Sequence, residues 1–504
     1  RPIPSLFALD QMGASVAGET RIRVRAKSPG AAPAPGAPKG PGLVRGLDAT
    51  AAAAIIVGIV IGSGIFRTPN QLAGIVGHTG LIFVVYAIAG VLVFMGALCY
   101  AELGAMLPRS GGPYVYTREA YGELPAFLVG WASFTMTQVG SVAAVATFFG
   151  EQSGSLVGYT GDFSVKTIAI GAIILLAVIN ILGVRLGGEV QVVFTGLKIA
   201  ALVGVILVGI YLGTGDRLAL TPVWPTSFDL SIWQAIGLAM VPALFTYDGW
   251  TNANNVAEEI KDPQRDLPKA LAMGTLFVMA IYIVAHFAFV WALGLDGLIA
   301  SDDQVAADVF TTAFSDDWSF RLSPAQVITL VIAVSLFGSL NGQTLGYPRL
   351  FYAMARDGVL FRSWGKVHPR FHTPHVAIMA QTVWATVLVV FGTFELLIEL
   401  VIFASFLFYA ANAGALIILR VRHPEWDRPY KVLAYPFVPI LFIVATLAFT
   451  VNLAFGSPGR SAVGLLLVLA GIPVYYLFRR FGKGPAEAPI TSGATGDLPD
   501  DENR

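Results

Sequence analysis

The chain has 504 residues, of which 55% are hydrophobic and 13% charged, and its 32 lysines and arginines balance 32 aspartates and glutamates. Soluble domains rarely combine so much apolar with so little charged sequence, whereas repeated apolar segments of about 20 residues are typical of polytopic membrane proteins. The zero net charge gives no sign of a nucleic-acid partner, and the single cysteine, Cys99, excludes an internal disulfide framework or a cysteine-based zinc site.

Hydropathy predicts about twelve membrane spans, of which the first and the sixth are interrupted. The predicted ranges are 46–77, 79–106, 123–150, 164–183, 188–213, 231–259, 268–295, 323–355, 374–393, 396–421, 433–455 and 460–480. A further helix at about 302–318 is too short and too acidic to cross a bilayer. We expect residues 1–42 and 483–504 to be disordered arms flanking a membrane domain at 43–482. The chain begins at Arg1 and not at methionine, which leaves the true start open.

The first span contains a glycine-rich interruption. An apolar helix from about Ala51 to Ile61 would be about 16 Å long, half of a ~30 Å hydrocarbon core, before it meets Gly62-Ser63-Gly64. Unwound backbone at that depth is tolerated where it lines a cavity, and the N-terminus of the next half-helix would present about half a positive charge there. A carboxylate fits such a site. The alternative is that the glycines only let two helices pack closely.

The sixth span contains a second interruption within Val241–Trp250. An apolar run from Ile232 ends at Asp248-Gly249, and a second half-helix is expected from Asn252 to Glu259. A charged aspartate at this depth costs about 2.5–3.5 kcal/mol and normally faces a cavity or a partner. The alternative is a neutral Asp248 that caps the second half-helix.

The two interrupted spans are five spans apart. This spacing predicts two five-helix repeats of inverted topology, at about 46–213 and 231–421, followed by extra helices at about 433–480.

Three other spans carry polar or small residues on one face. In span five, Gln191, Thr195 and Lys198 share a face, and an ammonium buried there needs oxygen partners. A purely structural contact of Lys198 with backbone carbonyls is the alternative to a functional role. The small residues of span eight either approach span one or only pack against neighbouring helices. The polar residues of span three either contact a ligand or only take part in helix packing. The residues concerned are Ser335, Ser339, Gly342 and Gly346 in span eight, and Thr135, Gln138 and Ser141 in span three.

Lysine and arginine are distributed unevenly between the two sides of the predicted membrane domain. With the N-terminus in the cytoplasm, 26 fall in the tails and cytoplasmic loops, and Arg67 and Lys198 fall within spans. The four outside are Lys166, Arg217, Arg321 and Arg460. The positive-inside rule therefore predicts a multi-pass protein of the cell membrane with both termini in the cytoplasm.

Five motifs together resemble those of the amino acid–polyamine–organocation superfamily, most closely the L-type amino acid transporter branch and its bacterial relatives. They are IGSGIF at 61–66, PRSGGPY at 108–114, FTYDGW at 245–250, EEIKDPQRDLP at 258–268 and YAMARDG at 352–358. The resemblance implies an all-α fold of the leucine-transporter type, with five plus five inverted helices and two extra helices at the C-terminus.

The resemblance also implies roles for residues at the two interruptions. Backbone N–H groups of Ser63, Gly64 and Ile65 would bind the α-carboxylate of an amino acid. Carbonyls near Ile61, Phe245 and Asp248 would bind its α-ammonium, Phe245 would gate the site and Trp250 would contribute to the wall. Lys198 resembles a replacement for a sodium ion of sodium-coupled relatives. The complete expected site is Ile61, Gly62, Ser63, Gly64, Ile65, Phe245, Thr246, Tyr247, Asp248, Gly249 and Trp250, with Lys198 as a coupling or structural cation.

The sequence therefore predicts a sodium-independent transporter for small to medium neutral L-amino acids, working by exchange or proton symport through alternating access. A cationic amino acid or polyamine carrier is the alternative, because Asp248 could attract a cation, and a channel is a more remote one. We expect no enzymatic activity and no cofactor. Metal binding by His368, His372 and His375 is not expected, because two prolines interrupt their loop. The expected partners are an amino acid substrate and the lipid bilayer. A homo-oligomer is left open, and no disulfide-linked subunit is expected, because Cys99 lies inside span two.

Overall fold

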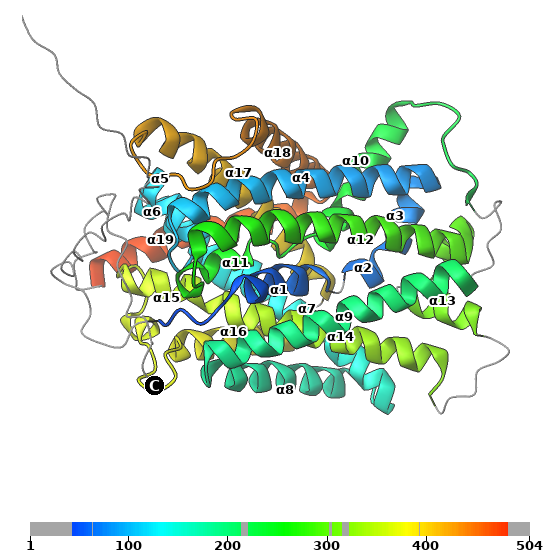
Figure 1. Ribbon diagram of the computed structural model, residues 1–504, viewed down its shortest axis with the longest axis horizontal. Helices are drawn as coiled ribbons and strands as arrows, with labels where there is room; N and C mark the ends of the chain where they lie inside the picture. Colours follow the sequence, from blue (N-terminus) through cyan, green and yellow to red (C-terminus); the bar gives the residue numbers. More distant parts are fainter. Residues whose placement is uncertain are drawn as a thin grey trace, which may run out of the picture.

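The computed structural model describes residues 43–62, 64–212, 220–301, 305–314, 322–392 and 394–481. Regular structure in this part is helical, and most helices run along the long axis of the molecule (Figure 1). Ten helices of the described part are long and apolar enough to cross a membrane, and two shorter apolar helices complete the predicted set of spans. The expected arms at 1–42 and 483–504 lie outside the described residues.

The helices follow the predicted spans closely. In chain order they are α1 (Ala49–Val60), α2 (Gly64–Arg67), α3 (Pro69–Val76), α4 (Thr79–Met106), α5 (Pro113–Tyr121), α6 (Glu123–Ala132), the π-helix η1 (Ser133–Thr137), α7 (Gln138–Val157), α8 (Asp162–Ile181), α9 (Val184–Leu212), α10 (Leu230–Thr246), α11 (Asn252–Asn255), the 3₁₀ helix η3 (Ala257–Glu259), α12 (Pro263–Ala300), α13 (Val305–Ala313), α14 (Pro324–Gly346), α15 (Pro348–Arg356), the 3₁₀ helix η4 (Arg362–Gly365), α16 (His375–Phe391), α17 (Phe394–Arg422), α18 (Phe437–Gly456) and α19 (Pro458–Phe481). The helix expected at about 302–318 is present as α13.

Side chains at the helix ends supply local start signals. The Asp48 carboxylate accepts the N–H of Ala51 in the first turn of α1, and Asp229 accepts those of Ser231 and Ile232 in the first turn of α10. Ser323 and Gln326 form a reciprocal capping box at the start of α14. Each cap satisfies N–H groups that have no partner within their own helix, which fixes where the helix begins.

Two features differ from the sequence prediction. Residues 107–122 fall between the second and third predicted spans, but they contain the buried helix α5, which begins at Pro113. Gly112 lies against span six, because a Cβ there would come within 2.9 Å of Asn254. The predicted eighth span also divides at Tyr347 into α14 and α15, and Pro348 occupies the first turn of α15, where a missing N–H is tolerated.

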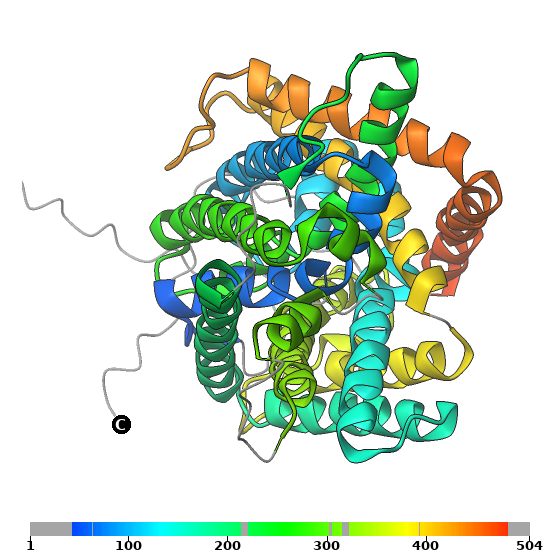
Figure 2. The ribbon, with the colours of Figure 1, turned by 90° about the vertical axis from the view of Figure 1, so that its right-hand side faces the viewer.

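Both predicted interruptions are present. The first span ends at Val60 and resumes at Gly64, and the sixth ends at Thr246 and resumes at Asn252. α1 and α10 enter the bundle from opposite ends (Figure 1), as the inverted repeats predict. Seen end on, the dark-blue α1 lies well inside the bundle, whereas α18 and α19, in orange and red, lie at its edge (Figure 2). The interruptions thus lie where other helices can surround them.

Residues 43–48 and the end of α19 lie at the same end of the bundle, which we call the terminal end (Figure 1). Here the Glu259 carboxylate pairs with Arg349 at 2.7 Å, with both side chains 0% exposed. The Glu259 carbonyl also accepts the N–H groups of Gly46 and Leu47, at 3.1 and 3.0 Å. Glu259 therefore connects residues 46–47, before α1, with the sixth span and with α15. These contacts join three segments of the chain at this end of the bundle.

Replacing Arg349 by methionine should destabilise the protein strongly. The change leaves the Glu259 carboxylate buried without its cation, which costs about 3–5 kcal/mol. The matched control is Arg185→Met, since the Arg185–Glu189 pair is 85% and 65% exposed and should contribute less than about 1 kcal/mol. Thermal unfolding of the purified proteins in detergent measures both. Equal melting temperatures for the two variants would contradict the importance of the buried pair.

Candidate functional site

The end of α1 is held by the ammonium group of Lys198, on α9. Its Nζ donates to the carbonyls of Gly58 (2.6 Å) and Ile61 (2.9 Å) and to Ser339 Oγ (2.9 Å). Three acceptors match the three N–H donors of an ammonium, and the positive charge lies at the negative end of a helix dipole. Lys198 is 1% exposed, so this contact supplies both the pairing that the buried cation needs and a cap for the interrupted helix.

The remaining polar residues of span five also face α1. Gln191 Nε2 and Thr195 Oγ1 donate to the Ala54 carbonyl, at 3.2 and 3.0 Å. Asn341 Nδ2, on α14, donates to Gln191 Oε1 at 2.9 Å. The predicted stripe therefore points into the bundle, and it fastens the first half of span one to α9 and α14.

The small-residue face of span eight approaches span one rather than serving only as packing. Ser335 Oγ donates to the Ile61 carbonyl at 3.2 Å, and Ser339 Oγ donates to that of Gly58 at 3.0 Å. A Cβ at Gly342 would come within 2.6 Å of Ile59. The Ile61 carbonyl was expected to bind the substrate α-ammonium, but it already accepts hydrogen bonds from Lys198 and Ser335. Since a carbonyl oxygen has two lone pairs, these two bonds use its acceptor capacity.

The two interruptions contact one another. A Cβ on Gly64 would lie 2.6 Å from Thr246 Cα, and one on Gly249 would lie 2.5 Å from the Ile59 side chain. Gly249 also has a φ of 105°, which favours glycine. The hydroxyl of Tyr282, on α12, lies 2.7 Å from the Val60 carbonyl and 3.2 Å from that of Thr246. One hydroxyl thus donates to carbonyls at the ends of both broken helices.

The expected site residues do not all face the same space. Thr246 Oγ1 lies 2.7 Å from Thr68 Oγ1, which is also 3.1 Å from the Tyr86 hydroxyl. Tyr247 packs on the rings of Tyr86 and Tyr282. These two side chains face α4 and α12. Phe245 is half-buried against the apolar core. Gly62, Gly64 and Ile65 are buried at the first interruption, and Ser63 lies outside the described residues.

Asp248 and Gly249 line a polar cavity of about 40 Å³. We call it the polar cavity. Its lining is Tyr100, Pro113, Val129, Ser133, Thr137, Gln138, Asp248, Gly249, Thr251, Asn252, Tyr347, Ser405, Phe408 and Tyr409. Among these described lining residues, Asp248 is the only carboxylate, and its Oδ1 accepts a hydrogen bond from the Tyr409 hydroxyl at 2.6 Å. The cavity therefore presents hydroxyl, amide and carboxyl groups next to the second interruption.

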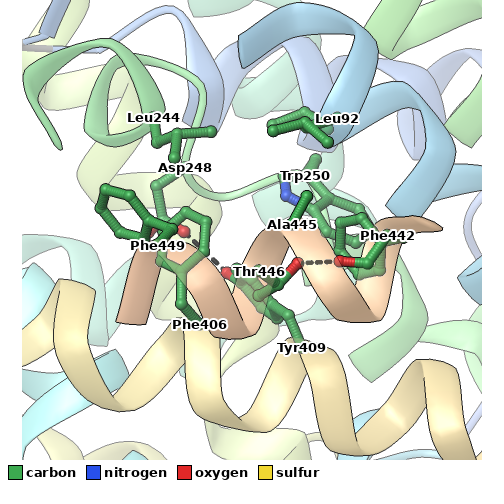
Figure 3. A pocket seen from close by; sticks show the side chains of 11 residues that line it. Leu92, Leu244, Asp248, Trp250, Phe406, Tyr409, Phe442, Ala445, Thr446 and Phe449 are labelled. Atoms are coloured by element: carbon green, nitrogen blue, oxygen red, sulfur yellow. Dashed lines mark hydrogen bonds between the residues drawn. The ribbon is translucent and has the colours of Figure 1, made fainter. Parts of the chain in front are cut away.

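Trp250 lines a second, smaller cavity of about 10 Å³, which we call the apolar cavity (Figure 3). Its wall is formed by Leu92, Val93, Leu244, Asp248, Trp250, Phe406, Tyr409, Phe442, Ala445, Thr446 and Phe449. The Trp250 ring packs edge-on against Tyr100 at 4.9 Å and lies 5.2 Å from the Tyr409 ring. Trp250 thus lines a different cavity from the one that Gly249 lines, and its expected place in the wall of a substrate site stays a prediction.

Several lining residues were not expected from the sequence, among them Tyr100, Tyr347 and Tyr409, which come from different helices. Ser133 and Thr137 lie in η1, a π-helical turn of the third span. Such turns occur frequently at functional sites. The available signal was the alternation of polar residues with Phe134 and Met136 between Ser133 and Gln138, a stretch from which the sequence analysis named Thr135 and Gln138.

Comparison with known proteins finds a match to the amino acid permease family over residues 47–478. The serine/threonine exchanger SteT of Bacillus subtilis (strain 168) is 32% identical over 437 residues, covering 86% of this chain and 97% of that protein. The human b(0,+)-type amino acid transporter 1 is 32% identical over 461 residues, covering 89% and 90%. The large neutral amino acids transporter small subunit 2 of Oryctolagus cuniculus is 31% identical over 443 residues, covering 86% and 80%.

A match along nearly the whole described membrane domain, together with two interrupted helices that meet inside the bundle, confirms the resemblance seen in the motifs. The family is one of transporters and not of enzymes, in line with the sequence prediction. The chain belongs to the amino acid permease family of the amino acid–polyamine–organocation superfamily and is a multi-pass membrane transporter of amino acids.

Proposed function

We propose that this chain carries small to medium neutral L-amino acids across the cell membrane without sodium. The observation that supports this most directly is the contact of Lys198 with the Gly58 and Ile61 carbonyls at the end of α1. A fixed ammonium there supplies the positive charge that a bound sodium ion would otherwise bring to the same oxygens. Transport then needs no sodium to hold α1 against α14.

In this proposal the substrate binds across the two interruptions. Its α-carboxylate lies at the N-terminus of α2, near Gly64 and Ile65, where unpaired N–H groups and the helix dipole favour an anion. Its α-ammonium binds carbonyls of Phe245 and Asp248 at the second interruption, and the Phe245 carbonyl uses the lone pair that remains beside its 3.0 Å hydrogen bond from the Asp248 N–H. The Ile61 carbonyl contributes little, because Lys198 and Ser335 already donate to it. Phe245 is proposed as the gate over the bound side chain.

The proposal includes an orientation with the terminal end in the cytoplasm. The excess of lysine and arginine in the loops and tails of that side supports it. The buried Glu259–Arg349 pair closes that end, so the pair must part when substrate leaves to the cytoplasm. Alternating access would then move the helices that carry the interruptions relative to the rest of the bundle.

A second candidate is transport of cationic amino acids or polyamines. Asp248 favours it, because this buried carboxylate lines the polar cavity and could pair with a cationic side chain. The b(0,+)-type relative and the serine/threonine exchanger are equally similar to the chain, so similarity alone does not choose between the candidates. Exchange and proton symport are the two coupling modes that the proposal admits.

Purified protein in liposomes loaded with unlabelled amino acid should accumulate labelled alanine or serine equally well when choline replaces sodium. Repeating the assay with and without a pH gradient separates exchange from proton symport. Excess arginine or putrescine should inhibit poorly. A requirement for sodium would contradict the proposed role of Lys198, and strong inhibition by arginine would favour the second candidate.

Lys198→Ala should reduce transport while leaving expression largely intact. The change removes the charged donor of the Gly58 and Ile61 carbonyls, which keep only the hydroxyls of Ser339 and Ser335. The loss should cost about 1–3 kcal/mol, or about 5- to 150-fold in a conformational equilibrium. Lys166→Ala is the matched control, because that lysine pairs only with a largely exposed Asp162. Normal counterflow by a folded Lys198→Ala protein would refute the role.

Gly64→Ala should weaken substrate binding by about 5- to 150-fold, since overpacking typically costs 1–3 kcal/mol. Its Cβ would meet Thr246 Cα at 2.6 Å and displace the start of α2 from the second interruption. Gly74→Ala on α3 is the control, because no atom lies within 4 Å of a Cβ there. Binding of labelled substrate to the purified proteins measures the effect, and equal affinities would exclude this carboxylate position.

A further inference from the structure

The polar and the apolar cavity share two lining residues, Asp248 and Tyr409. The Tyr409 hydroxyl donates to Asp248 Oδ1 at 2.6 Å, which is a short hydrogen bond to a carboxyl group. Figure 3 shows this pair beside side chains of α17 and α18 that line the apolar cavity. The pair therefore stands between two spaces of opposite chemical character.

The polar cavity suits a short side chain. Its volume of about 40 Å³ holds about three water-sized groups. Gln138 lines it, and the buried Gln138 Oε1 has no hydrogen-bond partner among the described residues. An apolar group pushed into this space would leave the amide unpaired and desolvated, which is costly. A hydroxyl group, by contrast, could donate to Gln138.

The apolar cavity suits a different occupant. Phe406 on α17 and Phe442 and Phe449 on α18 form much of its wall, and the Phe406 and Phe449 rings pack at 4.8 Å. Its present volume of about 10 Å³ is too small for a branched side chain. A substrate side chain could reach this cavity only if the side chain of Asp248 or Tyr409, which separates it from the polar cavity, were removed.

We propose that the hydrogen-bonded pair Asp248–Tyr409 is a partition that restricts this transporter to amino acids with short side chains, such as alanine, serine and threonine. The inference rests on the proposed function, which places the substrate α-ammonium at the backbone of Phe245 and Asp248. The substrate side chain then starts next to the partition. It can enter the polar cavity, but the partition keeps a leucine or phenylalanine side chain out of the apolar cavity.

The partition acts through its volume rather than through its charge. Asp248→Asn keeps the size of the side chain and an oxygen that accepts from Tyr409, so the apolar cavity should stay closed. Asp248→Gly removes the side chain and joins the two cavities. Since one methylene in an apolar pocket discriminates about 10- to 200-fold, the joined space should bind leucine at least about tenfold better than the wild type does.

The test is inhibition of labelled serine uptake by alanine, threonine, leucine and phenylalanine, with wild type, Asp248→Asn and Asp248→Gly in serine-loaded liposomes. We expect strong inhibition by alanine and threonine but weak inhibition by leucine for wild type and Asp248→Asn. For Asp248→Gly, the half-inhibitory concentration of leucine should fall at least about tenfold. Tyr409→Ala opens the same partition from α17 and replaces Asp248→Gly if that protein does not fold.

Filling the apolar cavity provides the matched control. Ala445→Leu on α18 is introduced only together with Asp248→Gly, because Ala445 lines only the apolar cavity and the present volume of about 10 Å³ has no room for the added atoms. Combined with Asp248→Gly, it should abolish the gain of leucine inhibition. Persistence of the gain in the double variant would mean that leucine uses another space and would overturn the partition.

Two further outcomes separate this inference from the proposed function. Equal inhibition of the wild type by serine and leucine would overturn the partition and leave amino acid transport intact. The same conclusion would follow if the half-inhibitory concentration of leucine fell as far in Asp248→Asn as in Asp248→Gly. Absence of uptake of any neutral amino acid by the folded wild type would contradict the proposed function itself and the partition with it.

Discussion

The structure depends on how the backbone groups freed at two helix interruptions find partners away from water. In a bilayer each unpaired N–H or C=O costs several kcal/mol, so an interrupted helix persists only if the surrounding protein supplies donors and acceptors. Here Lys198 and Ser339 cap α1, and Tyr282 donates to the ends of both broken helices. These contacts give partners to backbone groups that the two interruptions leave without helical hydrogen bonds.

The contacts that hold the interruptions come from two groups of neighbouring helices. α9 and α14 hold the first half of span one through Lys198, Gln191 and Ser339. α12 and α4 hold the other side through Tyr282 and Tyr86. The proposed substrate position lies between these groups, so a movement that lets substrate in or out must exchange some of these hydrogen bonds. This explains why buried polar residues are concentrated around the interruptions in so apolar a chain.

Selectivity has a separate physical origin. In the proposed site, the backbone of the interruptions would bind any amino acid by its two charged ends and would not distinguish side chains. The proposal therefore assigns discrimination to the space beside the second interruption, which Gln138, Asp248 and Tyr409 line. Binding and selectivity are thus assigned to different parts of the site, which agrees with a family whose members share a fold and differ in substrate.

The sequence by itself determined the spans, both interruptions and the inward stripe of Lys198, because hydropathy, glycine and helical periodicity are local properties of the chain. Tertiary structure alone decided which groups meet. The contact of Tyr409 with Asp248 and the assembly of the polar cavity join residues far apart in the chain, and no local pattern encodes such a distance. The sequence did not predict helix α5, because the burial of this helix depends on the packing of Gly112 against Asn254 of span six. The Ile61 carbonyl was expected to be available to substrate, and only three-dimensional packing showed that Lys198 and Ser335 already occupy it.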